Sequence, residues 1–283
     1  MTDLQDVIDA IDTLKPIPPV ATQILVLAED INSSLTEIAD LILHDPTITA
    51  NVLRMCNSAY FGLARKVESV QDAVALLGLD RIIELVLMDS LSDNFIDEHQ
   101  GYGLGEGELW RHSVLSAHVA QTLVNHHGIS SNKHLVFTAA LVKDIGKLIL
   151  GRYVAFSLEK INILVDSRGY SFNEAEKEVI GMNHEELGAL MAKKWRFGEK
   201  LIYIIQNHHL SDESARVDTE TVLVYLADIV CMMMGMSTGV DGLAYRFYSD
   251  VLKRMQLTEN DLQQVIVETS EKRGKIESLL NLV

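Results

Sequence analysis

Apolar residues recur at helical spacing through most of this chain, and that pattern constrains the fold more than any other feature. Val and Ile residues mostly return every three or four positions rather than alternating, which is typical of helices. Clear start and stop signals divide the pattern. Asp45 is a typical N-cap before Pro46, and Ser69 and Gly78 bracket a helix over residues 70–77. The sequence therefore predicts an all-α fold, a bundle of many helices.

A glycine-rich stretch at residues 101–107 interrupts this pattern, either as a subdomain boundary or as a simple connector. We expect an N-terminal helical subdomain over residues 1–100, a second helical subdomain over 101–240, and further helices over 241–283. In the second subdomain the pattern predicts helices at residues 108–126, 134–150, 172–180, 184–195, 199–209 and 219–234. Apolar clusters in the last helices, at 255–257 and 279–282, leave two roles open: burial against the core, or formation of a homodimer.

Charge and cysteine content exclude several classes of protein. A formal net charge of −16 disfavours binding to a phosphate backbone or to anionic lipid, so we expect no nucleic-acid or membrane partner. Cys56 and Cys231 lie far apart, each in an apolar stretch. This arrangement predicts buried free thiols, which are typical of proteins in a reducing compartment. The longest apolar run, residues 222–236, is too short to span a bilayer and contains Asp228. No signal peptide is apparent, and these features predict a cytoplasmic protein.

Several imidazoles and carboxylates occupy helical positions from which they can meet at one point. The candidates are Glu108, His112, Asp144, His184, His208, His209 and Asp228. Glu108 and His112 are four residues apart and share a helix face, and Asp228 would be costly to bury alone. Nitrogen and oxygen ligands of this kind suit Mn, Fe, Ni or Zn. Singly, each residue has a structural explanation: Glu108 also fits a helix N-terminus, and Asp228 also fits a buried acid that packs between helices.

The order of these residues resembles the HD superfamily of metal-dependent phosphohydrolases. In that family a helix His is followed by a His-Asp pair and a later Asp, and the HD-GYP branch adds a Glu, another His and an adjacent His pair. The resemblance implies metal ligands at Glu108, His112, Asp144, His184, His208, His209 and Asp228. Lys147 matches the lysine that faces a substrate phosphate. If the chain is an enzyme, Asp144 and Lys147 are therefore its expected catalytic residues.

The resemblance to the HDOD family, the HD-related output domain of bacterial signalling proteins, is closer. It covers about residues 14–230 and implies an HD-domain-like helical bundle with a regulatory role. The stretches that carry it are Pro16-Ile17-Pro18-Pro19, residues 45–62, residues 70–78, residues 184–188 with Trp195, and His208-His209.

Two departures from the HD pattern bear on activity. Lys143 stands where the enzymes carry the His of the His-Asp pair, and a protonated ammonium cannot ligate a metal. Its side chain can either pair with Asp144 or Asp228 or turn away, and in both cases we expect one divalent transition metal (Fe, Mn, Ni or Zn), or none, rather than two. In addition, no Gly-Tyr-Pro loop follows His209, so hydrolysis of cyclic di-GMP is not expected.

Two functions follow from these features. The first is a non-catalytic signalling or regulatory module with a degenerate HD metal site, whose partner is a signalling protein or a small-molecule or nucleotide ligand. The alternative is a metal-dependent phosphohydrolase that acts on a nucleotide or phosphodiester, with metal-activated water as the nucleophile.

Overall fold

The computed structural model describes residues 4–282 apart from residue 16, residues 30–34, residue 128, residues 237–238 and residue 243. Pro16, the first residue of the N-terminal motif, therefore lies outside the described residues. Throughout the described part the regular elements are helices, and none of them is a strand. The all-α fold predicted from the sequence is confirmed. None of these helices combines the length and the apolar character that crossing a lipid bilayer requires.

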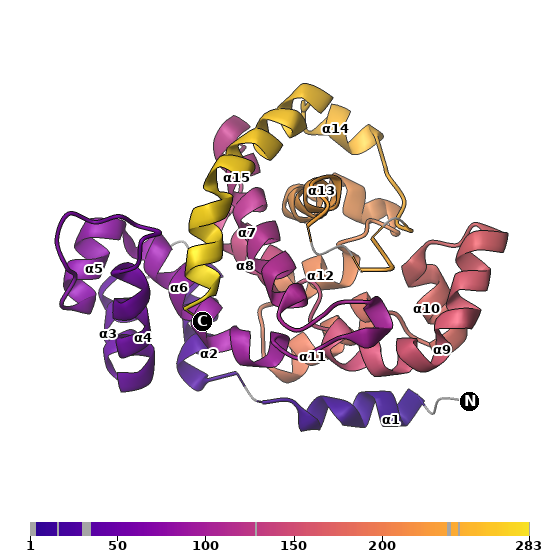
Figure 1. Ribbon diagram of the computed structural model, residues 1–283, viewed down its shortest axis with the longest axis horizontal. Coiled ribbons are helices and arrows are strands. Elements are labelled where there is room, and N and C mark those ends of the chain that lie inside the picture. Colours follow the sequence, from indigo (N-terminus) through magenta and orange to yellow (C-terminus); the bar gives the residue numbers. More distant parts are fainter. Residues whose placement is uncertain are drawn as a thin grey trace.

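The helices between residues 19 and 95 form the N-terminal group at one side of the molecule, to the left in Figure 1, whereas residues 4–13 run along the bottom of that view toward the right. Asp45 caps one of them by accepting hydrogen bonds from the backbone N–H groups of Thr47 and Ile48, and Ser69 caps another through the N–H of Asp72, as the sequence predicts. The elements are α1 (Leu4–Asp9), η1 (Ala10–Thr13), α2 (Pro19–Glu29), α3 (Leu35–Leu43), α4 (Pro46–Cys56), α5 (Val70–Leu77) and α6 (Leu79–Phe95).

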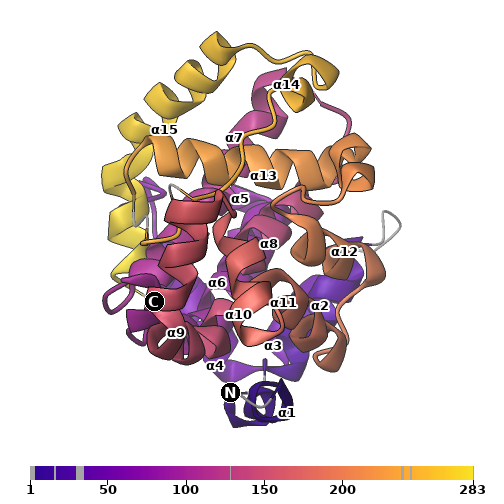
Figure 2. The same ribbon diagram turned by 90° about the vertical axis from the view of Figure 1, so that its right-hand side faces the viewer.

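The second group of helices surrounds a core made by α7, α8 and α13, which pack against one another (Figure 2). Val114, Leu141 and Val224 from these three helices are fully buried. The elements are η2 (Gln100–Tyr102), α7 (Glu108–His127), α8 (Lys133–Val142), α9 (Lys147–Arg168), α10 (Phe172–Ile180), α11 (His184–Lys194), α12 (Glu199–Asn207), η3 (Glu213–Val217) and α13 (Thr219–Met233).

The prediction of a single helix over residues 134–150 is wrong. The structure has two helices, α8 and α9, which meet at a turn over residues 143–146, and α9 continues to Arg168. The turn lets the start of α11 approach closely. A Cβ atom on Gly146 would overlap the carbonyl oxygen of His184 and would lie 2.8 Å from the backbone nitrogen of Gly188. Glycine at this position therefore brings Asp144 close to His184.

The C-terminal elements are α14 (Asp250–Arg254) and α15 (Glu259–Leu280). In Figure 1, α15 runs beside α7 toward the N-terminal group. Leu257 and Leu279, one from each apolar cluster noted in the sequence, are buried against the core. Burial against the core, the first of the two expected roles, is thus what the structure shows, and the homodimer stays a prediction.

Candidate functional site

Six of the seven candidate ligands meet in one buried site, which we call the histidine pocket. They form two adjoining groups, and within each group the potential ligand atoms lie within 4.8 Å of one another. Asp144 lies between the groups: its Oδ2 is 3.9 Å from His112 Nε2, and its Oδ1 is 3.9 Å from His184 Nε2 and 3.8 Å from His208 Nε2. The first group is His112, Asp144 and Asp228, and the second, the imidazole cluster, is His184, His208 and His209.

Glu108, the seventh candidate, is in neither group. Its Oε2 accepts a hydrogen bond of 2.8 Å from the backbone N–H of Gly105, at the start of α7. This is the helix N-terminal position that the sequence offered as its alternative, where the positive end of the helix dipole stabilises a carboxylate.

Lys143 is fully buried and points into the first group. Its ammonium contacts the Asp144 carboxylate and lies 2.7 Å from Asp228 Oδ1 and 3.2 Å from His112 Nε2. The three ligand atoms that would hold an ion therefore already face a positively charged group. A metal cation does not fit this first position while Lys143 is protonated, because it would meet the ammonium at contact distance.

The pocket keeps these groups charged. Burial alone would lower the pKa of Lys143, but the carboxylates of Asp144 and Asp228 outweigh it and raise that pKa above its ordinary value. Burial would likewise raise the pKa of Asp144, yet the ammonium groups of Lys143 and Lys147 hold it well below its usual range. The ammonium and the carboxylates thus stabilise one another as ions.

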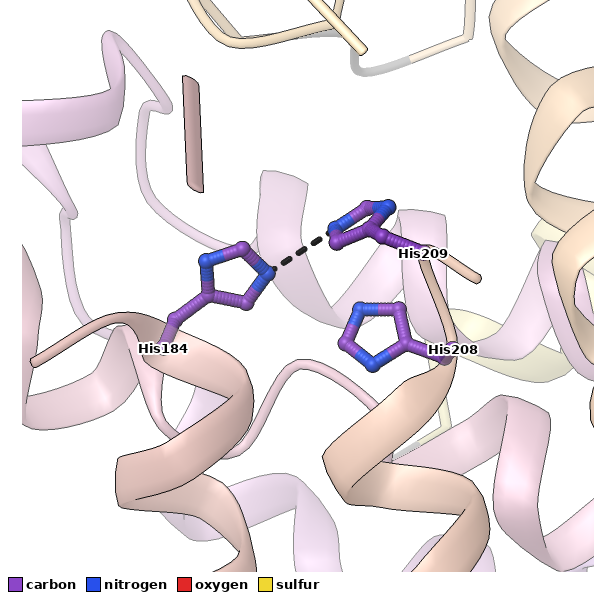
Figure 3. Close-up of side chains that lie close together, drawn as sticks. All are labelled: His184, His208 and His209. Atoms are coloured by element: carbon purple, nitrogen blue, oxygen red, sulfur yellow. Dashed lines mark hydrogen bonds between the residues drawn. The ribbon is translucent and has the colours of Figure 1, made fainter. Parts of the chain in front are cut away.

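The imidazole cluster has the chemistry of an ion site. Figure 3 shows the three rings turned toward one another from the start of α11 and the end of α12. His208 Nδ1 donates its hydrogen to the carbonyl oxygen of Ile205 at 2.9 Å, so Nε2 carries the lone pair. This Nε2 is buried, and no described residue bonds to it. Burial lowers the pKa of His208 to about 3, which keeps the ring neutral and able to ligate a metal.

Glu176, which is not among the site residues predicted from the sequence, orients His184. Its Oε2 lies 2.7 Å from His184 Nδ1 and accepts a second bond of 3.0 Å from the backbone N–H of His184, while Oε1 accepts from the Tyr102 hydroxyl at 2.6 Å. Carboxylates that fix the outer nitrogen of a histidine are common behind metal ligands. A signal was present, because Glu176 falls between Phe172 and Ile180 on the apolar face of α10.

Asp241 and Tyr245, which follow α13, close the other side of the pocket, and no pattern in the sequence indicates either residue. Asp241 Oδ2 lies 2.8 Å from Lys147 Nζ and accepts a hydrogen bond of 2.6 Å from the Tyr245 hydroxyl. The Tyr245 ring stacks on His209, with 3.8 Å between centroids and 15° between planes. The cavity beside these residues is only about 20 Å³. That is room for a water molecule, not for a nucleotide.

Comparisons with known proteins agree with this architecture. A structure from Geobacter sulfurreducens, described as an HDOD domain protein with unknown function, is 23% identical with a TM-score of 0.72 and covers 99% of each chain. One from Marinobacter aquaeolei VT8, named provisionally as a signal transduction protein, is 19% identical with a TM-score of 0.75, covering 100% of this chain and 61% of its own. One from Shewanella amazonensis SB2B, named provisionally as a phosphohydrolase, is 21% identical with a TM-score of 0.68, covering 98% and 97%.

At these identities the three structures show the fold alone. An uncharacterized protein of Treponema pallidum (strain Nichols) is 22% identical over 204 residues, which are 71% of this chain and 38% of that protein, so the chain spans well under half of that relative. The family model for the HDOD domain matches residues 14–211. Because this match covers most of the sequence, the chain belongs to the HDOD domain family.

Proposed function

We propose that the chain is a regulatory module of a signalling system that performs no hydrolysis, and whose histidine pocket holds at most one divalent transition ion. The observation that carries this proposal is the Lys143 ammonium, which contacts Asp144, Asp228 and His112 where a first ion would sit. HD enzymes that use two metals need both positions, because the paired ions stabilise the attacking and leaving oxygens together.

The second position fits an ion of the Fe, Mn, Ni or Zn class. His184, His208 and His209 would hold it, with Asp144 on the near side. An ion bound there would join α11 to the end of α12 and so stabilise one packing of these helices. Any regulation then requires that the ion, a small-molecule or nucleotide ligand, or a signalling protein bind one packing more tightly than another.

Contacts around Lys147 also disfavour turnover. A substrate phosphate that approached this lysine would have to displace the Asp241 carboxylate, which lies 2.8 Å from the ammonium. Tyr245, whose ring is stacked on His209, also lies beside this lysine, with 5.9 Å between Lys147 Nζ and the ring centroid. Lys147 is therefore engaged with two of the protein's own carboxylates, those of Asp144 and Asp241.

A metal-dependent phosphohydrolase remains the second candidate, because the imidazole cluster and Asp144 are in place. In that reading His184, His208 and His209 would hold one ion, which would supply an activated water, and Lys147 would bind a phosphate oxygen. The two functions differ in an assay. We expect purified protein incubated with nucleotides, linear phosphodiesters and p-nitrophenyl phosphate, each with Mn²⁺, Fe²⁺ or Ni²⁺, to release phosphate or alcohol no faster than an Asp144→Ala variant. Metal-dependent turnover that disappears in Asp144→Ala would overturn the regulatory proposal.

A further inference from the structure

A second pocket, of about 370 Å³, is lined by residues of α6, α7 and α15. Figure 1 shows α15 beside α7, running toward the N-terminal group. The lining of this second pocket does not include any member of the histidine pocket. The residues that matter for its chemistry are Tyr60, Arg81 on α6, His118 and Gln121 on α7, and Thr269 and Lys272 on α15. The pocket thus joins α15, which lies beyond the HDOD match at residues 14–211, to helices inside that match.

Two polar atoms in the lining are buried without a partner. His118 is 9% exposed and Thr269 is 2% exposed, and neither His118 Nε2 nor Thr269 Oγ1 bonds to any described residue. A buried polar atom left unpaired costs free energy, so such atoms normally bond to water or to a ligand. Both residues line a space many times larger than one water molecule.

The Arg81 side of the pocket is held in a fixed geometry. Arg81 Nη1 donates to Glu84 Oε2 and to Gln121 Oε1, each at 2.6 Å, and Gln121 Nε2 donates to Glu84 Oε1 at 2.5 Å. Glu84 thereby balances the charge of Arg81, while the remaining guanidinium N–H groups can donate to a ligand.

Lys272 adds a positive charge to the lining, and among the described residues none forms an ion pair with it. Burial, together with the positive charges of Arg81 and Lys272, lowers the pKa of His118 to about 3. Two cationic groups, those of Arg81 and Lys272, therefore lie close enough to act on His118, and Glu268 is the acidic side chain in the lining of the same pocket.

Flat rings complete the lining. The centroids of Tyr60 and His118 are 5.9 Å apart, and both side chains line the pocket. Aromatic and imidazole rings of this kind favour flat heteroaromatic groups by stacking. The volume is at the lower end of the range for small-molecule sites.

We infer that this second pocket binds a small anion that carries a flat ring, of the size of a nucleoside monophosphate. Its negative group lies toward Lys272 and Arg81, and its polar ring edge bonds to His118 Nε2 and Thr269 Oγ1. The ligand contacts α6, α7 and α15 at once, so it stabilises the docking of the C-terminal helix on the HDOD core.

Isothermal titration calorimetry on the full chain tests this inference, with AMP and GMP as probes and adenosine and inorganic phosphate as comparisons. We expect AMP or GMP to bind saturably and more tightly than adenosine or phosphate. Lys272→Gln and Thr269→Val should each weaken that binding at least about fivefold, the loss expected for one charged or one buried hydrogen bond.

Lys275→Gln is the matched control, because Lys275 is exposed on the same helix and does not line the pocket. It should leave the Kd unchanged, as should His208→Ala in the histidine pocket. The inference is overturned if neither AMP nor GMP binds, or if the Kd is unchanged in both pocket variants. It is also overturned if Lys275→Gln weakens binding as much as the pocket variants do, or if His208→Ala weakens it. These outcomes do not depend on whether the histidine pocket binds metal.

Discussion

Lys143→Met is expected to lower the free energy of unfolding by about 3–5 kcal/mol, the usual cost of removing one partner from a buried ion pair. In the native pocket two ammonium groups, of Lys143 and Lys147, face three carboxylates, of Asp144, Asp228 and Asp241. Methionine keeps the length of the side chain but leaves one more buried negative charge unbalanced. Urea unfolding followed by circular dichroism measures the loss.

Two further variants show whether the charge is the cause. The double variant Lys143→Met/Asp228→Asn restores the original difference between ammonium groups and carboxylates, and we expect it to be more stable than Lys143→Met alone. Lys160→Met removes an exposed lysine from α9 and should change stability by no more than about 0.5 kcal/mol. A loss below about 1 kcal/mol in Lys143→Met, the range of surface ion pairs, would contradict the importance we give to the buried ammonium.

Lys143→His is expected to raise the metal content of the protein by about one ion per chain relative to wild type. The substitution removes the positive charge beside Asp144 and Asp228 and supplies the imidazole that the HD enzymes have at this place. Calorimetric titration with Mn²⁺ and elemental analysis of the dialysed protein give the stoichiometry.

Lys143→Gln separates the loss of charge from the gain of a ligand. It removes the ammonium without supplying an imidazole, so we expect it to bind fewer ions than Lys143→His. An unchanged stoichiometry in Lys143→His would mean that the ammonium does not decide whether the first position is filled.

The sequence predicts a helix correctly where capping residues near its two ends mark where it begins and ends. The helix at residues 172–180 is found at those residues because it begins at a capping box formed by Ser171 and Glu174 and ends at Gly181 with a positive φ. By contrast, the turn at residues 143–146 depends on the approach of His184 from α11 to Gly146. A contact between residues so far apart leaves no periodic signal near the turn.

The candidate site likewise has residues that the sequence predicts and residues that it does not. The order of histidines and acids along the chain led to the six residues that meet in the histidine pocket. The sequence leaves the orientation of the Lys143 side chain open, because its long flexible stem can reach the pocket or turn away from it. Only the packing of α7, α8 and α13 selects one of these two orientations. Asp241 and Tyr245 lie between helices, outside any repeating pattern, so nothing near them in sequence indicates that they cover Lys147 and His209.

Anomalous diffraction at the zinc absorption edge, from crystals grown with Zn²⁺, tests the central claim most directly. We expect at most one peak in the histidine pocket, next to the Nε2 atoms of His184 and His208, with the Lys143 side chain in density between Asp144 and Asp228. A strong peak between His112, Asp144 and Asp228, with the ammonium displaced, would contradict the account.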